Sequence, residues 1–166
     1  MAQAHAIDAA VKSLLNKLDY TFNDISLLDE ALTHRSHAAI NNERLEFLGD
    51  GILNFVIAHE LFKQYPEVNE GDLSRLRANL VNKESLAEIA THLELGEVIK
   101  LGSGELKSGG FRRPSILADA VESIFGAVYC DGGFDVCRDL IVRLYKDRLA
   151  SPTDLQSLKD PKTRLQ

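Results

Sequence analysis

The sequence has few of the residues that mark a secreted or membrane-bound protein. Its 166 residues include two cysteines, one methionine and no tryptophan. We interpret Cys130 and Cys137 as small apolar side chains of a reduced protein, not as a disulfide. No apolar run is long enough to span a membrane, and the start of the chain lacks the basic and apolar regions of a signal peptide. These absences predict a cytoplasmic protein without membrane contact.

Positive charge is also scarce. The chain has 19 lysines and arginines against 25 aspartates and glutamates, which gives a formal net charge of −6. Affinity for nucleic acid comes mostly from neutralisation of phosphates by lysine and arginine. If this protein acts on nucleic acid, the affinity must come from bound metal, from a local basic patch or from another domain.

Strand patterns are missing, and helical periodicity runs through most of the chain. Asp24 and Asp72 are expected to cap helices, and Pro66 and Gly96 are expected to follow helix ends. A glycine-rich loop is expected over residues 101–114. The expected helices are 6–18, one beginning after Asp24, 43–65, one beginning after Asp72, 85–93, 115–129 and 134–149. This pattern predicts one all-α helical bundle, for which the chain is long enough.

Carboxylates gather on a segment that is otherwise largely apolar, residues 41–61, NNERLEFLGDGILNFVIAHEL. Glu43, Glu46 and Asp50 are spaced at i, i+3 and i+7 and share one face of a helix. A helix that is apolar nearly all round is usually buried, and buried carboxylates need a partner or a metal. Only Arg44 lies nearby in sequence, so a divalent cation is the simplest partner.

A second apolar segment, residues 115–131, carries Asp119 and Glu122 at i, i+3. If the two acidic faces meet, they form one oxygen-only ligand set, which suits Mg²⁺ or Mn²⁺ better than zinc. Its members are Glu46, Asp50, Asp119 and Glu122. From the residues alone, a solvated charged face remains the alternative.

The glycine-rich loop could hold a phosphate, because glycines expose backbone N–H groups and its cations could complete the site. The alternative is an ordinary surface loop. The candidate phosphate contacts are Lys107, Arg112 and Arg113. His34 and His37 have the spacing of a zinc pair but no supporting cysteine or third histidine, so we expect His34 to be a hydrogen-bonded residue at a helix end.

Residues 43–50, ERLEFLGD, resemble the signature of the ribonuclease III family. The resemblance extends over about residues 10–150 and includes further motifs in the family's order. These are ALTHRS at 31–36, EGDLSRLR at 70–77, GELKSGG at 104–110 and ILADAVE at 116–122. The chain is most similar to the single-polypeptide bacterial members of the family.

The resemblance implies a homodimeric nuclease domain with a helical-bundle fold. It makes Glu46, Asp50, Asp119 and Glu122 the catalytic metal ligands, for Mg²⁺ or a substituting Mn²⁺, and it implies no small-molecule cofactor. It also implies auxiliary roles for the acidic residues Glu43 and Glu70, and a dimer contact for Phe47. Without the resemblance, Phe47 would be expected in the core and Glu70 to favour a helix N-terminus. Gly51 departs from the serine often found there in the family.

The activity implied is hydrolysis of double-stranded RNA to products with 5′-phosphates, 3′-hydroxyls and staggered 3′ overhangs, as in rRNA and mRNA processing. Residues 1–150 would form the nuclease domain. Residues 151–166 would begin a linker to a double-stranded-RNA-binding domain that is not in this sequence, because 160–166, DPKTRLQ, resemble the lead-in to that domain.

Two other functions are compatible with acidic helices. All-α nucleotide pyrophosphohydrolases also pair acidic helices around Mg²⁺, but they do not explain residues 31–36 and 104–110. A non-catalytic RNA-binding or dimerisation module would be expected to lack at least one of the four acidic ligands. The nuclease is therefore the favoured function.

Overall fold

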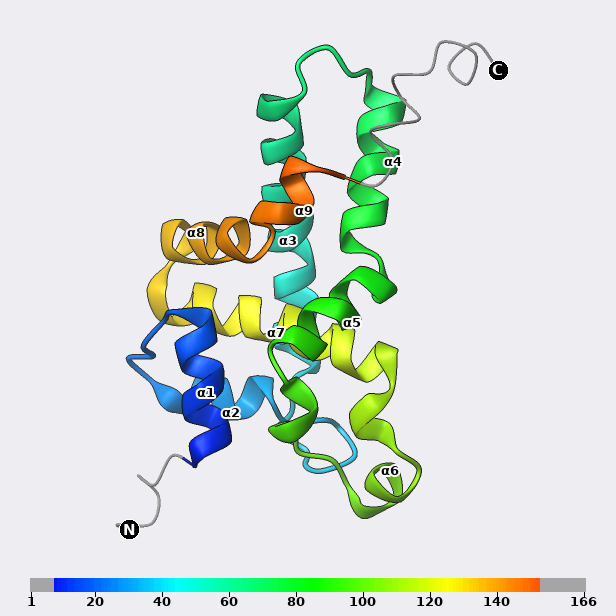
Figure 1. Ribbon diagram of the computed structural model, residues 1–166. Coiled ribbons are helices and arrows are strands. Elements are labelled where there is room, and N and C mark those ends of the chain that lie inside the picture. The colour runs from blue at the N-terminus through cyan, green and yellow to red at the C-terminus, as the bar shows by residue number, and fades with distance from the viewer. Residues whose placement is uncertain (1–7, 153–166) are drawn as a thin grey trace.

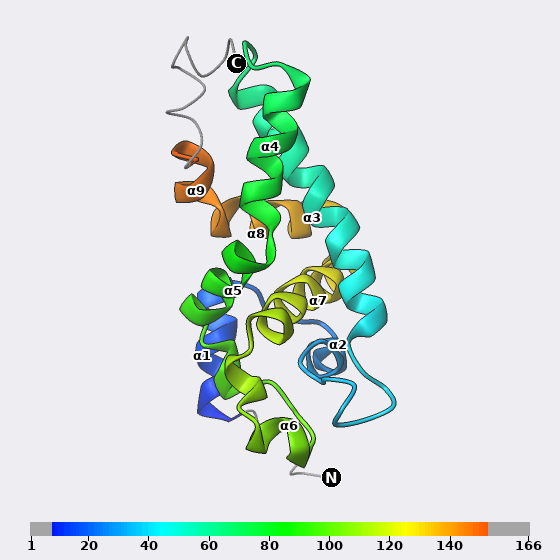
Figure 2. The same ribbon diagram turned by 90° about the vertical axis from the view of Figure 1, so that its right-hand side faces the viewer.

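The computed structural model describes residues 8–152, and in that range it contains helices and turns but no strand (Figures 1 and 2). Only an isolated parallel bridge joins Thr33 to Lys100 there. The prediction of an all-α fold is confirmed. None of the described helices combines the length and the apolar character needed to cross a bilayer.

The helices follow one another with short connections. They are α1 (Ala9–Leu18), α2 (Ile25–Ala31), α3 (Glu43–Gln64), α4 (Glu70–Val81), α5 (Lys83–His92), α6 (Ser103–Lys107), α7 (Pro114–Gly132), α8 (Phe134–Leu144) and α9 (Lys146–Ala150). Two 3₁₀ turns, η2 (Leu95–Glu97) and η3 (Gly110–Arg112), flank α6.

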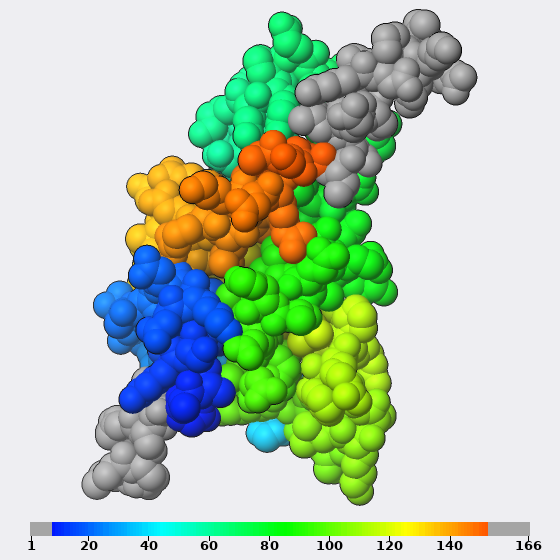
Figure 3. Space-filling view, in the orientation of Figure 1, coloured from blue at the N-terminus to red at the C-terminus, as the bar shows by residue number. Residues whose placement is uncertain are grey.

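Helix α7 forms the centre of the fold. Nearly every residue from Ile116 to Val128 is buried, as its apolar sequence predicts. It packs against α2, α3, α5 and α8. In the space-filling view, the neighbouring elements leave little of its yellow surface visible on the face shown (Figure 3). Helices α3 and α4 lie side by side and extend away from α7 (Figures 1 and 2). The core therefore sits where α3 crosses α7.

Two glycines let the backbones of α3 and α7 touch at this crossing. A Cβ atom on Gly49 would lie 1.7 Å from the carbonyl oxygen of Glu122, and one on Gly126 would lie 2.3 Å from that of Leu45. No other residue type fits either position without moving a helix. The role of these glycines was not apparent from the sequence, although their close contact lets the two acidic helices pack together.

Some predicted boundaries are confirmed and others are wrong. The side chain of Asp24 caps α2 by accepting a hydrogen bond from the Ser26 amide, as predicted. Asp72 is not a cap, because Asn69 fills that role and accepts a hydrogen bond from the Asp72 amide at 2.8 Å. Helix α4 therefore begins at Glu70, earlier than the start predicted after Asp72.

The ends of several helices also differ from those predicted. Helix α5 begins at Lys83 after its Asn82 cap and ends before Gly96, which lies inside η2. Helix α7 continues to Gly132 and stops at Gly133, where φ is +91°. Helix α1 begins after Asp8, while residues 6 and 7 lie outside those that the structure describes.

The loop predicted for residues 101–114 is wrong in part, since it contains α6 and η3. The last predicted helix is broken at Tyr145, between α8 and α9. The buried Tyr145 hydroxyl donates to the Leu80 carbonyl oxygen at 2.9 Å. This contact with α4 is long-range, so local periodicity could not reveal it.

Candidate active site

The acidic faces of α3 and α7 meet, as the sequence predicted. Glu46 of α3 and Asp119 and Glu122 of α7 each offer a carboxylate oxygen, and these oxygens all lie within 4.8 Å of one another. The three residues form the acidic cluster. Asp119 and Glu122 sit one turn apart on the central helix, and the glycine contact places Glu46 against them.

Asp50 lies one turn farther along α3 and is exposed at the edge of the acidic cluster. Asn54 donates from its Nδ2 to the Asp50 backbone oxygen at 2.9 Å and to Oδ1 at 3.3 Å. Asp50 still interacts with the cluster, because its carboxylate raises the pKa of Glu122. The structure thus brings three predicted ligands tightly together and places the fourth beside them.

Burial and mutual repulsion disfavour the charged forms of these carboxyls. Glu122 is only 6% exposed, and burial raises its pKa well above the ordinary value, with further increases from the neighbouring carboxylates. Burial also raises the pKa of Glu46, and the charge of Asp119 adds to it. Burial raises the pKa of Asp119 as well, although positive charge on His34 and Arg35 lowers it in part. The cluster therefore favours a cation.

The residues present fit a hard divalent metal. The donors are carboxylate oxygens from two rigid helices, the ligand type preferred by Mg²⁺ and Mn²⁺. A divalent charge would offset the repulsion that raises the three pKa values. By contrast, the pair at His34 and His37 is not arranged for zinc. The Nδ1 of His34 lies 2.8 Å from the Ser36 hydroxyl, and that of His37 lies 3.3 Å from the Leu101 carbonyl oxygen.

A cleft opens beside the acidic cluster and extends toward η3. Its volume is about 210 Å³, and besides Glu46 and Asp119 its walls include further charged and polar side chains. These are His34, Arg35, Asn42, Glu43, Glu105, Arg113 and Ser115. The sequence analysis did not assign Arg35 or Glu105 to the site, although both belong to motifs that carried the family resemblance.

Several known proteins are similar to this chain in sequence and in fold. A family model described as Ribonuclease-III-like matches residues 24–149. The chain belongs to the ribonuclease III family. The Ribonuclease 3 of Alkalilimnicola ehrlichii is 64% identical over 93% of this chain and 68% of its own length. The Ribonuclease 3 of Bordetella petrii is 60% identical, and this chain spans 62% of its length.

A solved structure supports the assignment. The nuclease domain of the Campylobacter jejuni ribonuclease III superposes with a TM-score of 0.81 at 45% identity. The match covers 82% of this chain and 96% of that one. The described residues therefore have the fold of a ribonuclease III nuclease domain, and the family recognised from the motifs is confirmed.

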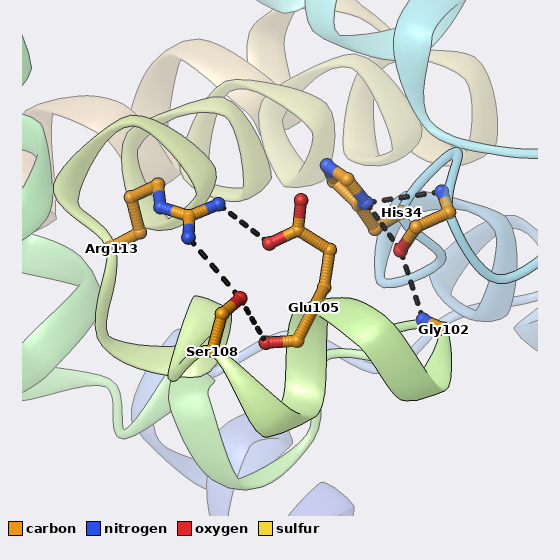
Figure 4. Close-up of polar contacts among 6 residues, drawn as sticks. His34, Gly102, Glu105, Ser108 and Arg113 are labelled. Carbon is orange, nitrogen blue, oxygen red and sulfur yellow. Dashed lines mark hydrogen bonds and ion pairs between the residues drawn. The ribbon is translucent and has the colours of Figure 1, made fainter.

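Of the three predicted phosphate contacts in this ribonuclease III domain, only Arg113 lines the cleft. Its guanidinium is paired with the Glu105 carboxylate at 2.5 Å (Figure 4). Arg112 instead lies over the Phe111 ring, 4.8 Å from its centroid, and lines a hollow beside α5. Lys107 is exposed at the end of α6. The roles of Lys107 and Arg112 remain predictions.

The auxiliary acids lie in different places. Glu43 lines the cleft, 3.6 Å from Arg35. Glu70 follows the far end of α3, which lies about 27 Å along the helix from Glu46 at 1.5 Å per residue. Its carboxylate accepts a hydrogen bond from the Ser74 hydroxyl at 3.1 Å. Within one subunit, Glu70 is therefore not part of the acidic cluster.

Mg²⁺ should raise the thermal stability of this domain, and more so at about pH 8 than at about pH 6. The raised pKa values mean that the folded state holds protons that the unfolded state releases, so stability without metal falls as pH rises through this range. Metal competes with those protons and gains affinity as they leave. Thermal unfolding monitored by circular dichroism at matched ionic strength measures the gain. In the double variant Asp50→Asn, Glu122→Gln, an unchanged gain would place the metal elsewhere.

Proposed function

We propose that this chain is the catalytic domain of an endoribonuclease that hydrolyses double-stranded RNA with Mg²⁺, for which Mn²⁺ can substitute. The products carry 5′-phosphates, 3′-hydroxyls and staggered 3′ overhangs, and the natural role is rRNA and mRNA processing in the cytoplasm. The observation that carries the proposal is the convergence of Glu46, Asp119 and Glu122 from two helices in backbone contact. Family membership supports RNA as the polymer.

The protein's own residues position the reaction. Glu46, Asp119 and Glu122 would hold the cation, and Asp50 would complete the ligand set from the edge of the cluster. When bound, the cation lowers the pKa of a water molecule and stabilises charge on the phosphate oxygens. Burial fixes Glu122 and keeps bulk water from it, while the exposed Asp119 faces the side from which RNA approaches. Water is the nucleophile, so no side chain need form a covalent bond.

A homodimer is part of the proposal. Phe47 was predicted to be a dimer contact, and it does not lie in the core, where it would be expected without the family resemblance, because the residue is 81% exposed. Phe55 and Phe62, 58% and 70% exposed, lie about 20° apart around α3, and Phe47 lies within about 80° of both. The three therefore share one side of the helix and form an aromatic stripe. Such a stripe is costly in water unless a partner covers it. A solved Campylobacter jejuni relative has a region involved in dimer formation. A twofold contact through the stripe would place two sites on one duplex.

Phe47→Glu should dissociate the dimer. The substitution occurs on both subunits of a twofold interface. It replaces apolar surface with two negative charges that would be buried in the same interface. Analytical ultracentrifugation should show monomer at concentrations where the unchanged chain is a dimer. Leu106→Glu is the matched control, since Leu106 is also exposed, at 49%, but lies on α6 away from the stripe. If Phe47→Glu remains dimeric, as the control is expected to, a dimer contact through Phe47 is excluded.

The function is tested with long duplex RNA incubated with the chain in Mg²⁺ or in EDTA. Short duplex products that form only with Mg²⁺ support the proposal. The same preparations are tested for release of pyrophosphate from nucleoside triphosphates, the reaction of the pyrophosphohydrolase alternative. Failure to cut RNA, with intact binding of RNA, would identify a non-catalytic module.

The domain assignment also remains a proposal. We place the nuclease domain at residues 1–150, which contain the region matched by the family model. Residues 151–166 would begin a linker to an RNA-binding domain, although 153–166 lie outside the residues that the structure describes. The net charge of −6 supports a further source of RNA affinity.

A further inference from the structure

His34 occupies the wall of the cleft and is fixed there by pairing with a distant segment. Its amide donates to the Lys100 carbonyl oxygen at 2.9 Å, and the Lys100 amide donates to the Leu32 carbonyl oxygen at 2.8 Å. The same stretch of chain is tied again where His37 Nδ1 lies 3.3 Å from the Leu101 carbonyl oxygen. The backbone that carries His34 is therefore held on both sides of the residue.

The ring of His34 is held as firmly as its backbone. The Ser36 amide donates to Nδ1 at 3.1 Å, and the Ser36 hydroxyl oxygen lies 2.8 Å from the same nitrogen (Figure 4). The Gly102 amide donates to that hydroxyl oxygen at 2.9 Å. A Cβ atom on Gly102 would lie 2.3 Å from the Ser36 carbonyl oxygen, so this close approach requires glycine.

These contacts determine which ring nitrogen carries the proton. Nδ1 receives an N–H from Ser36 and therefore acts as an acceptor. Because the Ser36 hydroxyl oxygen already accepts from Gly102, its own hydrogen is free to point at Nδ1 as well. A neutral imidazole with an acceptor at one nitrogen is a donor at the other. His34 therefore presents Nε2–H, for which the described residues supply no hydrogen-bond partner.

We propose that His34 contacts the substrate, donating its Nε2–H to a non-bridging oxygen of an RNA phosphate in the cleft. This inference rests on the proposed function. The cleft contains the acids Glu46, Glu105 and Asp119, and Glu105 already pairs with the Arg113 guanidinium. An anionic substrate therefore needs other donors beside the cation. A histidine locked as a donor supplies one.

The tautomer can be read without any activity measurement. Long-range ¹H–¹⁵N spectra of the histidine rings, above the pH at which histidine is protonated, should show His34 with its proton on Nε2. The His34→Gln variant assigns the signals. Ser36→Ala removes the hydroxyl and should shift His34 toward a mixture of tautomers. A proton on Nδ1 in the unchanged chain would overturn the proposal.

Two substitutions then separate the ring nitrogens. The amide nitrogen of glutamine can reach the position of Nε2, whereas that of asparagine mimics Nδ1. His34→Asn and His34→Ala should therefore reduce kcat/KM for duplex RNA by about tenfold to a hundredfold, the range expected for a lost hydrogen bond to an anion. His34→Gln should recover most of it. Equal losses in the glutamine and asparagine variants would refute the contact.

Two further measurements exclude indirect effects. His92→Ala is the control, because this exposed histidine at the end of α5 does not line the cleft, and it should leave kcat/KM within about twofold. The Mg²⁺-induced rise in melting temperature should be unchanged in His34→Ala. Its loss would show that His34 acts on Asp119 and the cation, which overturns the substrate contact. If the unchanged chain does not cut RNA, the proposed function fails, while the tautomer measurement still stands.

Discussion

Gly49→Ala should destabilise this domain by about 3 kcal/mol, the upper end of the usual cost of overpacking, because the contact is rigid. The added methyl group would lie 1.7 Å from the Glu122 carbonyl oxygen, so α3 and α7 would have to move apart. The contact is with backbone, which cannot rotate away as a side chain can. Urea unfolding followed by circular dichroism measures the loss.

Gly51→Ala is the matched control for this change. It lies on the same helix, and a Cβ atom there meets nothing within 4 Å. Alanine should stabilise the helix at this position by about 1 kcal/mol. If Gly49→Ala lowers the free energy of unfolding and Gly51→Ala raises it, the two effects of alanine, close packing and helix propensity, are distinguished. A tolerated Gly49→Ala would mean that the helices do not cross in backbone contact.

Glu122→Gln should reduce RNA cleavage by at least about a thousandfold, or about 4 kcal/mol in the activation barrier. The change keeps the size of the side chain but removes one negative ligand from the acidic cluster. Cation binding weakens, and the water and the phosphate lose their alignment. Single-turnover cleavage of a duplex in low-millimolar Mg²⁺ measures the effect, and activity near that of the unchanged chain would reject Glu122 as a ligand.

Without metal, the same variant should be more stable than the unchanged chain, and the difference should grow with pH. The folded state raises the pKa of Glu122, so folding requires either a bound proton or a buried charge once the pH exceeds the ordinary carboxyl range. Glutamine carries neither cost. Melting temperatures in EDTA between about pH 5 and pH 8 test the trend. Glu97→Gln, on the exposed turn η2, should show no such trend.

The sequence predicts the helices and the faces on which their acidic residues lie, but it does not predict how closely two helices approach each other. Helical spacing identified the acidic faces that carry Glu46, Asp119 and Glu122, and the family resemblance favoured their meeting over a solvated charged face. Periodicity identifies the face of a helix but not how close another helix comes, so the roles of Gly49 and Gly126 became apparent only in the structure.

Short and interrupted elements were missed for related reasons. Asn69 and Asp72 are both good caps, and no local rule chose between them. Helix α6 has five residues and lies among glycines, which gives no detectable period. His34 was expected to form a hydrogen bond, but the Ser36 hydroxyl beside its ring also accepts from the Gly102 amide, which is far away in sequence. Such contacts are set by the assembled fold.

The crossing of α3 and α7 makes catalytic competence conditional on complete folding. Glu46 and Glu122 belong to helices separated by α4, α5 and α6, so no contiguous stretch of chain can build the cluster. During synthesis, cation affinity can arise only after α7 has been made and has packed against α3. A partly folded chain therefore lacks the complete acidic cluster, and any cleavage that depends on the cluster begins only once α3 and α7 have packed together.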